Sequence, residues 1–351
     1  MGARRIGMVS GAALALAAAA LPLVATPVMA VVPPTGTISE YGLPTQNDDP
    51  PGIGAGPDGN VWFTEQAANH GRIGRITPGG AITEFPVPTA NGTPSDVTAG
   101  PDGNVWFTEF DGSKVGRITP AGAITEFPLP VDGLYYDIFT RKLTSSHGPR
   151  HIVAGPDGAL WFAEFTASRI GRITTGGVVT EYSTPTPDSR PVDIDRGPDG
   201  ALWFSEPPAN RVGRITTAGV FTEFLVPTGS PGEATSSFPV GITSAPDGNL
   251  WFTEHVGNKV GRITTAGAIA EYAVPTPGSE PTFIDAGSDG NVWFSEYTGN
   301  KIARVTATGR ITEFPIPTAA AGAHGLAAGP DGNVWFTEVD ANAVGKVQVN
   351  S

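Results

Sequence analysis

One pattern of alternating apolar and polar residues recurs seven times along this chain. Each copy contains a five-residue segment in which tryptophan and phenylalanine precede a small residue and a glutamate, and the first is VWFTE at residues 61–65. All seven tryptophans lie in these copies, and successive ones are 44, 55, 42, 48, 42 and 42 residues apart. A repeat of ~40–50 residues is typical of one four-stranded blade of a β-propeller. The spacing therefore predicts seven blades.

The first copy shows the four strands that each blade is expected to contain. A short apolar segment at residues 52–55 precedes a GPDG turn, and VWFTE, RIGRIT at 72–77 and AITEFPVP at 81–88 follow. Period-two alternation of β-branched and aromatic residues predicts strands, and the glycine-containing pairs between them predict tight turns. No segment after residue 30 has a helical period. We therefore expect an all-β fold, a seven-bladed β-propeller of four-stranded blades.

The two ends of the repeat region complement each other. An isolated copy of the fourth strand, TISEYGLP at residues 37–44, comes first, whereas the last copy stops after its third strand at residues 343–348. Addition of the N-terminal strand to the last blade would close the ring and remove an open sheet edge. We expect one propeller domain at residues 34–351, closed by the N-terminal strand completing the last blade.

Residues 1–30 have the features of a secretory signal peptide. Arg4 and Arg5 precede an Ala- and Leu-rich segment at residues 12–25, and Val28-Met29-Ala30 resembles a cleavage site. An uncleaved membrane anchor is the alternative, but the apolar segment is short and no second one follows it. We expect a secreted, extracellular protein with no membrane span after removal of the signal.

The charge balance limits the partners of the chain. It has 34 Asp and Glu against 21 Lys and Arg, and removal of residues 1–30 lowers the formal charge from −13 to −15. This charge argues against nucleic acid and anionic membranes as partners. Twenty-one of the acids belong to the repeat, so the negative charge is spread around the ring. The absence of cysteine excludes thiol chemistry, and nothing in the pattern predicts an oligomer interface, so we expect a monomer.

Residues that recur in every blade are best interpreted as structural, and those that occur once as candidates for a site. The seven WFxE glutamates could form a ring of metal ligands, but bonding to backbone N–H groups of the following loop is the favoured interpretation. The histidines are unrepeated. They lie in or beside two kinds of connection, those that lead into a first strand and those that follow a second strand. Both kinds lie on the same face of a propeller, which we call the connection face. We expect all five on this rim: His70, His147, His151, His255 and His324.

The longest connection between blades lies at residues 131–150 and contains Tyr135, Tyr136 and His147. Long loops on a rigid scaffold often carry binding residues. A tolerated surface insertion is the alternative. Carboxylates are also expected on the inner strands beside the central channel, where they could serve acid/base chemistry or bind a hydrated cation; these are Asp96, Asp193, Asp195 and Asp285.

The repeat string resembles the virginiamycin B lyase (streptogramin B lyase) family over essentially the whole chain after the signal-like segment. Residues 82–88, 100–109 and 257–264 carry the match. Members of this family are seven-bladed propellers. The resemblance implies that the lactone of a cyclic depsipeptide antibiotic is opened by Mg²⁺-assisted elimination, in which a histidine base removes the α-proton beside the ester while the metal polarises the substrate.

The resemblance also implies roles for residues of the last blade. His324, in GAHGL at residues 322–326, matches the base, and Glu338 is the nearest match to a glutamate with a catalytic and Mg²⁺-binding role. Two positions depart from the family pattern, because Gly322 stands where a glutamate is expected and Thr282 where a second histidine is expected. Candidates to replace them are Glu280, Asp285 and His255.

Two functions are therefore open. One is a secreted lyase that uses His324, Glu338 and Mg²⁺, and the alternative is a non-catalytic extracellular propeller that binds a cell-wall, peptide or sugar ligand. Lactone hydrolysis on a six-bladed plan is disfavoured by the seven repeats. A small-molecule or cyclic peptide ligand is expected on the connection face, and the candidate binding residues are His255, His151, His147, Tyr135, Tyr136 and Asp285.

Overall fold

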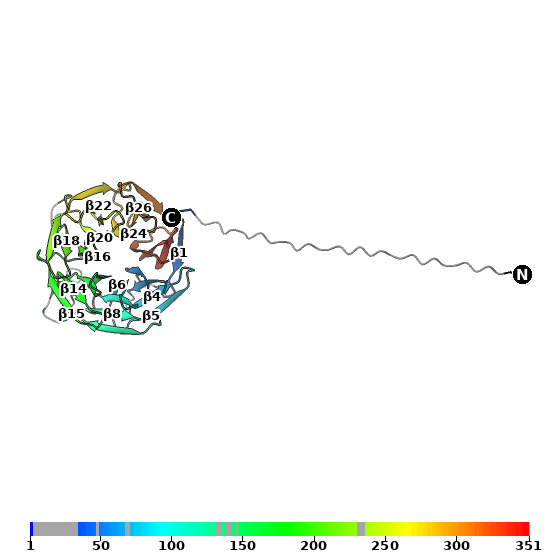
Figure 1. Cartoon of the computed structure of the whole chain (residues 1–351), viewed down its shortest axis with the longest axis horizontal. Helices are drawn as coiled ribbons and strands as arrows, with labels where there is room; N and C mark the ends of the chain where they lie inside the picture. The colour runs from blue at the N-terminus through cyan, green and yellow to red at the C-terminus, as the bar shows by residue number, and fades with distance from the viewer. Residues whose placement is uncertain are drawn as a thin grey trace. The chain divides into compact units, whose positions relative to one another are not determined.

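The computed structural model describes residues 1–2, 34–46, 49–66, 71–130, 133, 135–137, 142–144, 147–229 and 236–350. From Pro34 onward the chain is one compact unit, in which seven four-stranded antiparallel sheets are arranged as blades around a channel (Figure 1). The predicted fold class is confirmed. The described residues form strands and turns, and they include no helix that could cross a membrane. The predicted signal peptide falls almost entirely outside them.

In each blade the first strand lies innermost at the channel and the fourth lies at the outer edge. Blade 1 contains β2 (Ile53–Ala55), β3 (Val61–Glu65), β4 (Arg72–Ile76) and β5 (Ile82–Pro86). Blade 2 contains β6 (Pro94–Ala99), β7 (Val105–Glu109), β8 (Lys114–Ile118) and β9 (Ile124–Pro128). Blade 3 contains β12 (Pro149–Ala154), β13 (Leu160–Glu164), β14 (Arg169–Ile173) and β15 (Val179–Ser183), and a two-stranded hairpin of β10 (Tyr135–Asp137) and β11 (Lys142–Thr144) precedes it.

The remaining blades repeat this order. Blade 4 contains β16 (Ile194–Arg196), β17 (Leu202–Glu206), β18 (Arg211–Ile215) and β19 (Phe221–Leu225). Blade 5 contains β20 (Pro239–Ser244), β21 (Leu250–Glu254), β22 (Lys259–Ile263) and β23 (Ile269–Ala273). Blade 6 contains β24 (Pro281–Ala286), β25 (Val292–Glu296), β26 (Lys301–Val305) and β27 (Ile311–Pro315).

Blade 7 is built from both ends of the chain. It contains β28 (Ala323–Ala328), β29 (Val334–Glu338), β30 (Ala343–Val347) and, as its outer strand, β1 (Ile38–Gly42). Ile38 pairs with Val347 and Gly42 with Ala343 in an antiparallel register. The predicted closure of the ring by the N-terminal strand is confirmed, and Figure 1 shows β1 beside the C-terminus.

A hydrogen bond connects the repeated GPDG turn to the repeated tryptophan. In blade 2, Trp106 Nε1 donates to Asp102 Oδ1 over 2.9 Å, and Arg117 lies 3.5 Å from the other oxygen of this carboxylate. The indole stacks on Phe127 with ring centroids 5.4 Å apart. A Cβ at Gly100 would lie 2.3 Å from the indole, so this position is crowded; blade 5 has Ala245 there, and its Trp251–Asp247 bond is longer, at 3.3 Å. All seven tryptophans are fully buried, and this arrangement explains why GPDG and tryptophan recur together.

The WFxE glutamates are buried inside their own blades and do not ring the channel. Glu109 is fully buried, and neither of its carboxylate oxygens has a hydrogen-bond donor among the described residues, so the favoured interpretation of backbone bonding is wrong for it. Its neighbour is Glu126 of the fourth strand, which accepts from Thr89 at 2.8 Å and Lys114 at 2.7 Å. Burial, followed by the charge of Glu126, raises the pKa of Glu109 to about 7.

We expect replacement of Asp102 by alanine to lower the free energy of unfolding by about 2 kcal/mol, because the buried indole N–H of Trp106 loses its acceptor. Asp102→Asn keeps an oxygen acceptor and loses only the charge beside Arg117, so it should cost less than half as much. Urea unfolding of the two variants and the unchanged protein measures the difference. Equal losses in both would show that the charge, and not the indole bond, matters.

The buried carboxyl groups make stability depend on pH. Burial raises the pKa of Glu206 and Glu296 to about 7 and that of Glu254 to about 8, whereas such groups ionise near 4.5 when unfolded. Between these values the folded state holds more protons, so stability falls as pH rises from about 5 to 8. We expect a higher melting temperature at pH 5.5 than at pH 8.5. Glu109→Gln should reduce the difference, and a melting temperature that rises over this range would contradict the prediction.

Candidate functional site

A cavity of about 430 Å³ opens on the connection face and spans blades 5, 6, 7 and 1. Two kinds of position form its walls. One kind is at or just before the start of a first strand, and the other is just after the end of a second strand. The first kind supplies Asp49, Pro51, Glu280, Thr282 and His324, and the second supplies Gln66, His255, Tyr297, Val339 and Asp340. The predicted convergence of these two connections is thus observed for His255 and His324.

His324, on β28, is held in one tautomer at the wall of this pocket. Its Nδ1 lies 2.9 Å from the carbonyl oxygen of Pro51 in blade 1. Because a carbonyl only accepts hydrogen bonds, Nδ1 carries the proton and Nε2 keeps its lone pair. Burial lowers the pKa of His324 to about 4, although the bond to Pro51 acts in the opposite direction, and the positive charges of His151 and Arg150 lower it further. The imidazole is therefore neutral at physiological pH.

His255 lies in the same pocket as Thr282, where the family pattern has its second histidine. Its ring is 6.4 Å from that of Phe238, and burial lowers its pKa, so it too is neutral near pH 7. Its Nδ1 is buried and has no hydrogen-bond partner among the described residues. The pocket thus contains a second imidazole with an unused polar atom, which comes from blade 5 and not from position 282.

Three carboxylates surround Tyr297 in the pocket. The tyrosine hydroxyl donates to Asp340 Oδ2 over 3.1 Å. Its pKa is raised by partial burial and then by Asp340, with contributions from Glu280 and Asp49. Carboxylate oxygens are the ligands that Mg²⁺ prefers, usually one or two of them together with several waters. The donor chemistry of this wall therefore fits Mg²⁺ bound through one or two of Asp340, Glu280 and Asp49, since among the described residues it is His147, Glu164 and Glu181 that place three ligand atoms within 4.8 Å of one another.

Asp340 also accounts for the glycine at position 322. A Cβ added to Gly322 would lie 2.4 Å from Asp340 Oδ2 and 3.0 Å from the Asp340 backbone nitrogen. Any side chain at 322 would therefore collide with this carboxylate. In this chain the carboxylate beside position 322 therefore comes from Asp340, in the loop after β29.

Glu338 is not among the residues that line the pocket, so its expected work beside His324 stays a prediction. It is fully buried, is paired in the sheet with Ala323 and Ala343, and does not line the cavity. Burial and the adjacent charge of Glu40 raise its pKa to about 8. The chain reaches the pocket only one and two residues later, at Val339 and Asp340.

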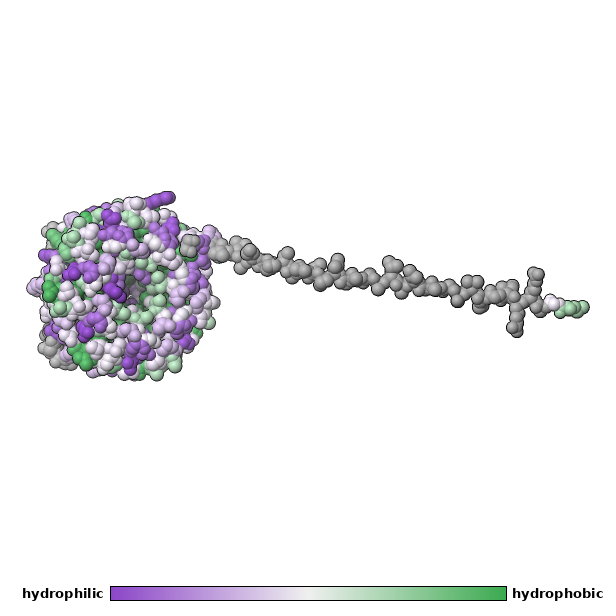
Figure 2. Space-filling view, viewed as in Figure 1, coloured by the Kyte–Doolittle hydropathy of each residue, from purple (hydrophilic) through white to green (hydrophobic). Residues whose placement is uncertain are grey.

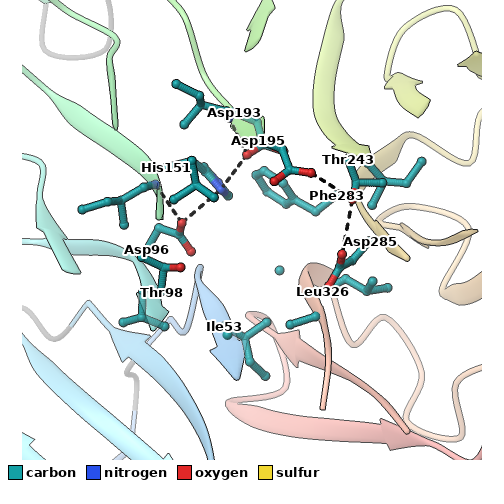
Figure 3. Close-up of a pocket in the computed structure, with 18 of the residues that line it drawn as sticks. Ile53, Asp96, Thr98, His151, Asp193, Asp195, Thr243, Phe283, Asp285 and Leu326 are labelled. Atoms are coloured by element: carbon teal, nitrogen blue, oxygen red, sulfur yellow. Dashed lines mark hydrogen bonds and ion pairs between the residues drawn. The ribbon is translucent and has the colours of Figure 1, made fainter. Parts of the chain in front are cut away.

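His151 and the inner-strand aspartates line a second cavity, of about 330 Å³, in the central channel (Figure 3). His151 Nδ1 lies 3.1 Å from Asp193 and 3.4 Å from Asp96. Burial opposes the charge of His151, but these two carboxylates outweigh it and raise its pKa. Figure 2 shows the hollow at the centre of the ring. The prediction that these aspartates lie at the channel is correct, whereas the placement of His151 on the rim is wrong.

Asp285 belongs to the channel cavity and not to the His324 pocket. Its carboxylate accepts from the backbone of Ala328 in the next blade at 2.7 Å and from Thr243 at 3.3 Å. Burial raises its pKa. Phe283 lies between the two cavities, since its ring centroid is 4.4 Å from that of His151 and 4.8 Å from that of His324. Asp285 therefore connects neighbouring blades, and Glu280 and His255 are the predicted substitutes that the pocket contains.

His147 is fully buried, which contradicts its predicted place on the rim. Its Nδ1 lies 3.0 Å from Glu164 and 3.1 Å from Glu181. Burial opposes its protonation, but hydrogen bonds to both glutamates outweigh it and raise its pKa to about 9. The three side chains lie close enough to hold a metal ion, but a protonated imidazole already supplies the positive charge. Tyr135 and Tyr136 lie on β10, but their side chains are outside the described part of the chain, as is all of His70.

Tyr297 and Asp340 were missed by reasoning from the sequence, although a signal for them exists. The position directly after each WFxE segment changes in nearly every blade, whereas the segment itself is constant, and Tyr297, His255, Gln66 and Val339 all occupy this position. Asp340 is one residue further on. When the repeats are compared, a position that varies directly after a constant motif at the rim of the fold identifies the pocket wall.

Comparison with known proteins agrees with this architecture. The model of the virginiamycin B lyase family matches residues 27–135 and 137–351. A streptogramin B lyase structure is 38% identical with a TM-score of 0.80, and the match covers 90% of this chain and 98% of that one. The selenomethionine-substituted virginiamycin B lyase from Staphylococcus aureus is 40% identical with a TM-score of 0.79, over 90% and 99%.

A third similar structure is a catalytically inactive histidine-to-alanine variant of virginiamycin B lyase from Staphylococcus aureus with quinupristin. It is 40% identical with a TM-score of 0.79, and the match covers 90% of this chain and 99% of that chain. No curated protein sequence matched the chain. The match of the family model over nearly the whole propeller, and the identity to solved structures, show that this chain belongs to the virginiamycin B lyase family.

Proposed function

We propose that this protein is a lyase that opens the lactone of a cyclic depsipeptide by elimination, with His324 as the general base. The observation that carries the proposal is the tautomer of His324, because the bond from Nδ1 to Pro51 leaves an unprotonated Nε2 on a neutral ring at the wall of a pocket. The relative from Staphylococcus aureus that is inactive as a histidine-to-alanine variant, and that was solved with quinupristin, supports a histidine-dependent reaction on such ligands.

In the proposed reaction, Nε2 of His324 takes the α-proton beside the lactone ester. The electron pair of that C–H bond forms a double bond to the β-carbon, the β-carbon–oxygen bond breaks, and the ester leaves as a carboxylate. No water is added, so the linear product has the mass of the substrate. The neutral state of His324 at pH 7 suits it to accept the proton, and Pro51 keeps the ring oriented while it does so.

The low pKa of His324 makes it a weak base, so the α-proton must be made more acidic. Mg²⁺, when held by one or two of Asp340, Glu280 and Asp49, would polarise the carbonyl next to that proton. The same three carboxylates lower the cost of the imidazolium that forms, since negative charge stabilises a nearby positive ring. His255 lines the same pocket and would contact the bound substrate. The signal-like residues 1–30 support export, which would place this activity outside the cell.

We expect the purified protein, mixed with a type B streptogramin and Mg²⁺, to convert the ring to a linear product of unchanged mass. His324→Ala should lower the rate at least about 100-fold, because the proton acceptor is lost, while circular dichroism and the melting temperature remain close to those of the parent. Mass spectrometry of the product measures the reaction. Addition of water would indicate hydrolysis and contradict elimination, and binding without turnover would favour a non-catalytic propeller.

A second expectation concerns the carboxylate that lies beside Gly322. Asp340→Asn removes a charge from the pocket wall and keeps its size, so the Mg²⁺ concentration needed for half-maximal turnover should rise by about 10-fold, which is the loss of about one charged ligand interaction. Asp111→Asn is the matched control, because Asp111 is exposed in blade 2 and bonds Thr93. An unchanged Mg²⁺ dependence in Asp340→Asn would remove Asp340 from the metal site.

A further inference from the structure

The channel cavity, of about 330 Å³, has polar side chains on one side only (Figure 3). Sites for small molecules begin at ~300 Å³, so the cavity is large enough for a small one. The polar side chains come from blades 2 to 6 and include Asp96, His151, Asp193, Asp195, Thr243 and Asp285. Blades 7 and 1 contribute apolar residues, which include Ile53, Gly54, Ala55, Gly325, Leu326 and Ala327. The lining therefore suits a ligand with one polar end and one apolar end.

The side chains that line the channel are not part of the repeated pattern. One residue of each first strand pairs with the tryptophan of the second strand and lines the cavity. At this position blade 1 has Gly54, blade 4 Asp195, blade 5 Thr243, blade 6 Asp285 and blade 7 Ala327. A blade therefore forms with or without a carboxylate there, and the two aspartates are not required by the fold of the repeat.

These two carboxylates meet at one hydroxyl group. Asp195 accepts from the backbone N–H of Ser244 and Asp285 from that of Ala328, both at 2.7 Å, so the neighbouring blades hold both carboxylates in place. The hydroxyl oxygen of Thr243 lies 3.4 Å from Asp195 Oδ2 and 3.3 Å from Asp285 Oδ1. A hydroxyl has one hydrogen to donate, so it can serve only one of them at a time. A ligand group with several N–H donors could serve both.

The cavity has more negative than positive groups. Four aspartates line it, and its lining includes no lysine or arginine among the described residues. His151 offsets part of this charge, since its Nδ1 lies 3.1 Å from Asp193 and 3.4 Å from Asp96. Burial raises the pKa of Asp195 to about 7, and the charge of Asp285 adds to the rise although the bond from Ser244 opposes it. A cation beside Thr243 would stabilise the ionised form of both carboxylates.

An organic cation fits this cavity better than a metal ion does. Among the described residues, the set that brings three metal-ligand atoms within 4.8 Å of one another is His147, Glu164 and Glu181, which lies outside the channel cavity. Mg²⁺ and Ca²⁺ need six or more oxygen ligands around one point. A primary ammonium group needs only three hydrogen-bond acceptors, and its alkyl chain can cover apolar surface.

We propose that the central channel binds a small primary alkylammonium ion. Its N–H groups donate to Asp195, Asp285 and Thr243, and its alkyl chain lies against Ile53 and Leu326 on the apolar side. This site is separate from the His324 pocket and does not depend on the proposed lyase reaction.

The experiment measures binding of n-butylammonium to the full chain by ligand-observed NMR at low ionic strength and pH 8. n-Butanol has the same chain without the charge, and methylammonium has the charge without the chain. We expect n-butylammonium to bind and both of the others to bind at least about 10-fold more weakly, because each lacks one half of the interaction. Binding of n-butylammonium should also weaken by about 10-fold from pH 8 to pH 6, since Asp195 and Asp285 then take up protons.

One substitution removes a charge from the cavity and keeps the size of the side chain. Asp285→Asn retains an oxygen acceptor for the backbone N–H of Ala328 and should weaken n-butylammonium by about 10-fold or more. Asp111→Asn is the matched control, because Asp111 is exposed in blade 2 and does not line the channel, and it should bind as the parent does. Melting temperatures show whether each variant is folded.

The proposal is overturned if n-butylammonium does not bind the parent protein, or if n-butanol or methylammonium binds equally well. Unchanged affinity in folded Asp285→Asn would also overturn it. If that variant does not fold, the comparison of the three ligands and the pH dependence test the site on the parent protein alone. Lactone opening is not measured in these experiments, so failure of the channel site leaves the proposed lyase activity untouched.

Discussion

The fold depends on a turn carboxylate that contacts the second and third strands of each blade. An aspartate in the GPDG turn accepts the indole N–H of the tryptophan four residues later, as Asp102 does for Trp106, and its other oxygen attracts a basic residue from the third strand. The indole is thereby held flat against the aromatic residue of the fourth strand. Because this contact occurs in all seven blades, the backbone emerges at the connection face along the same path each time.

This constancy lets the chemistry at the rim vary without a change of fold. The residue that enters each first strand is left-handed in blades 2 to 7, and it is Thr93, Gly148, Arg190, Phe238, Glu280 and Gly322 in turn. Such a conformation costs a non-glycine residue free energy and persists only where the surroundings enforce it. This equivalent position therefore supplies different groups in different blades. It supplies a pocket carboxylate at Glu280, an aromatic ring beside His255 at Phe238, and a guanidinium over Phe165 at Arg190.

The sequence predicts most of the fold but only part of the site. Tryptophan spacing and the isolated N-terminal strand suffice for seven blades and their closure, because both reflect backbone pairing. The meeting of His324 with His255 follows from which connections share a face. Burial does not follow from this: the sequence predicts His147 on the rim, whereas the structure holds it in the interior beside two glutamates. Glu338 ends a strand and is buried, so it does not line the pocket. Asp340 lies two residues further on, after the end of the strand, and does line it.

The opposite charges on the connection face explain how a weakly basic histidine can be useful. His324 lies between a wall that contains Asp49, Glu280 and Asp340 and a side that contains Arg150, and its pKa is low mainly because it is buried. A protonated His324 would be attracted by the first wall and repelled by the second. The carboxylate wall thus offsets part of the opposition that burial and Arg150 present to proton uptake, so His324 can be neutral in the free protein and still accept a proton in the proposed reaction.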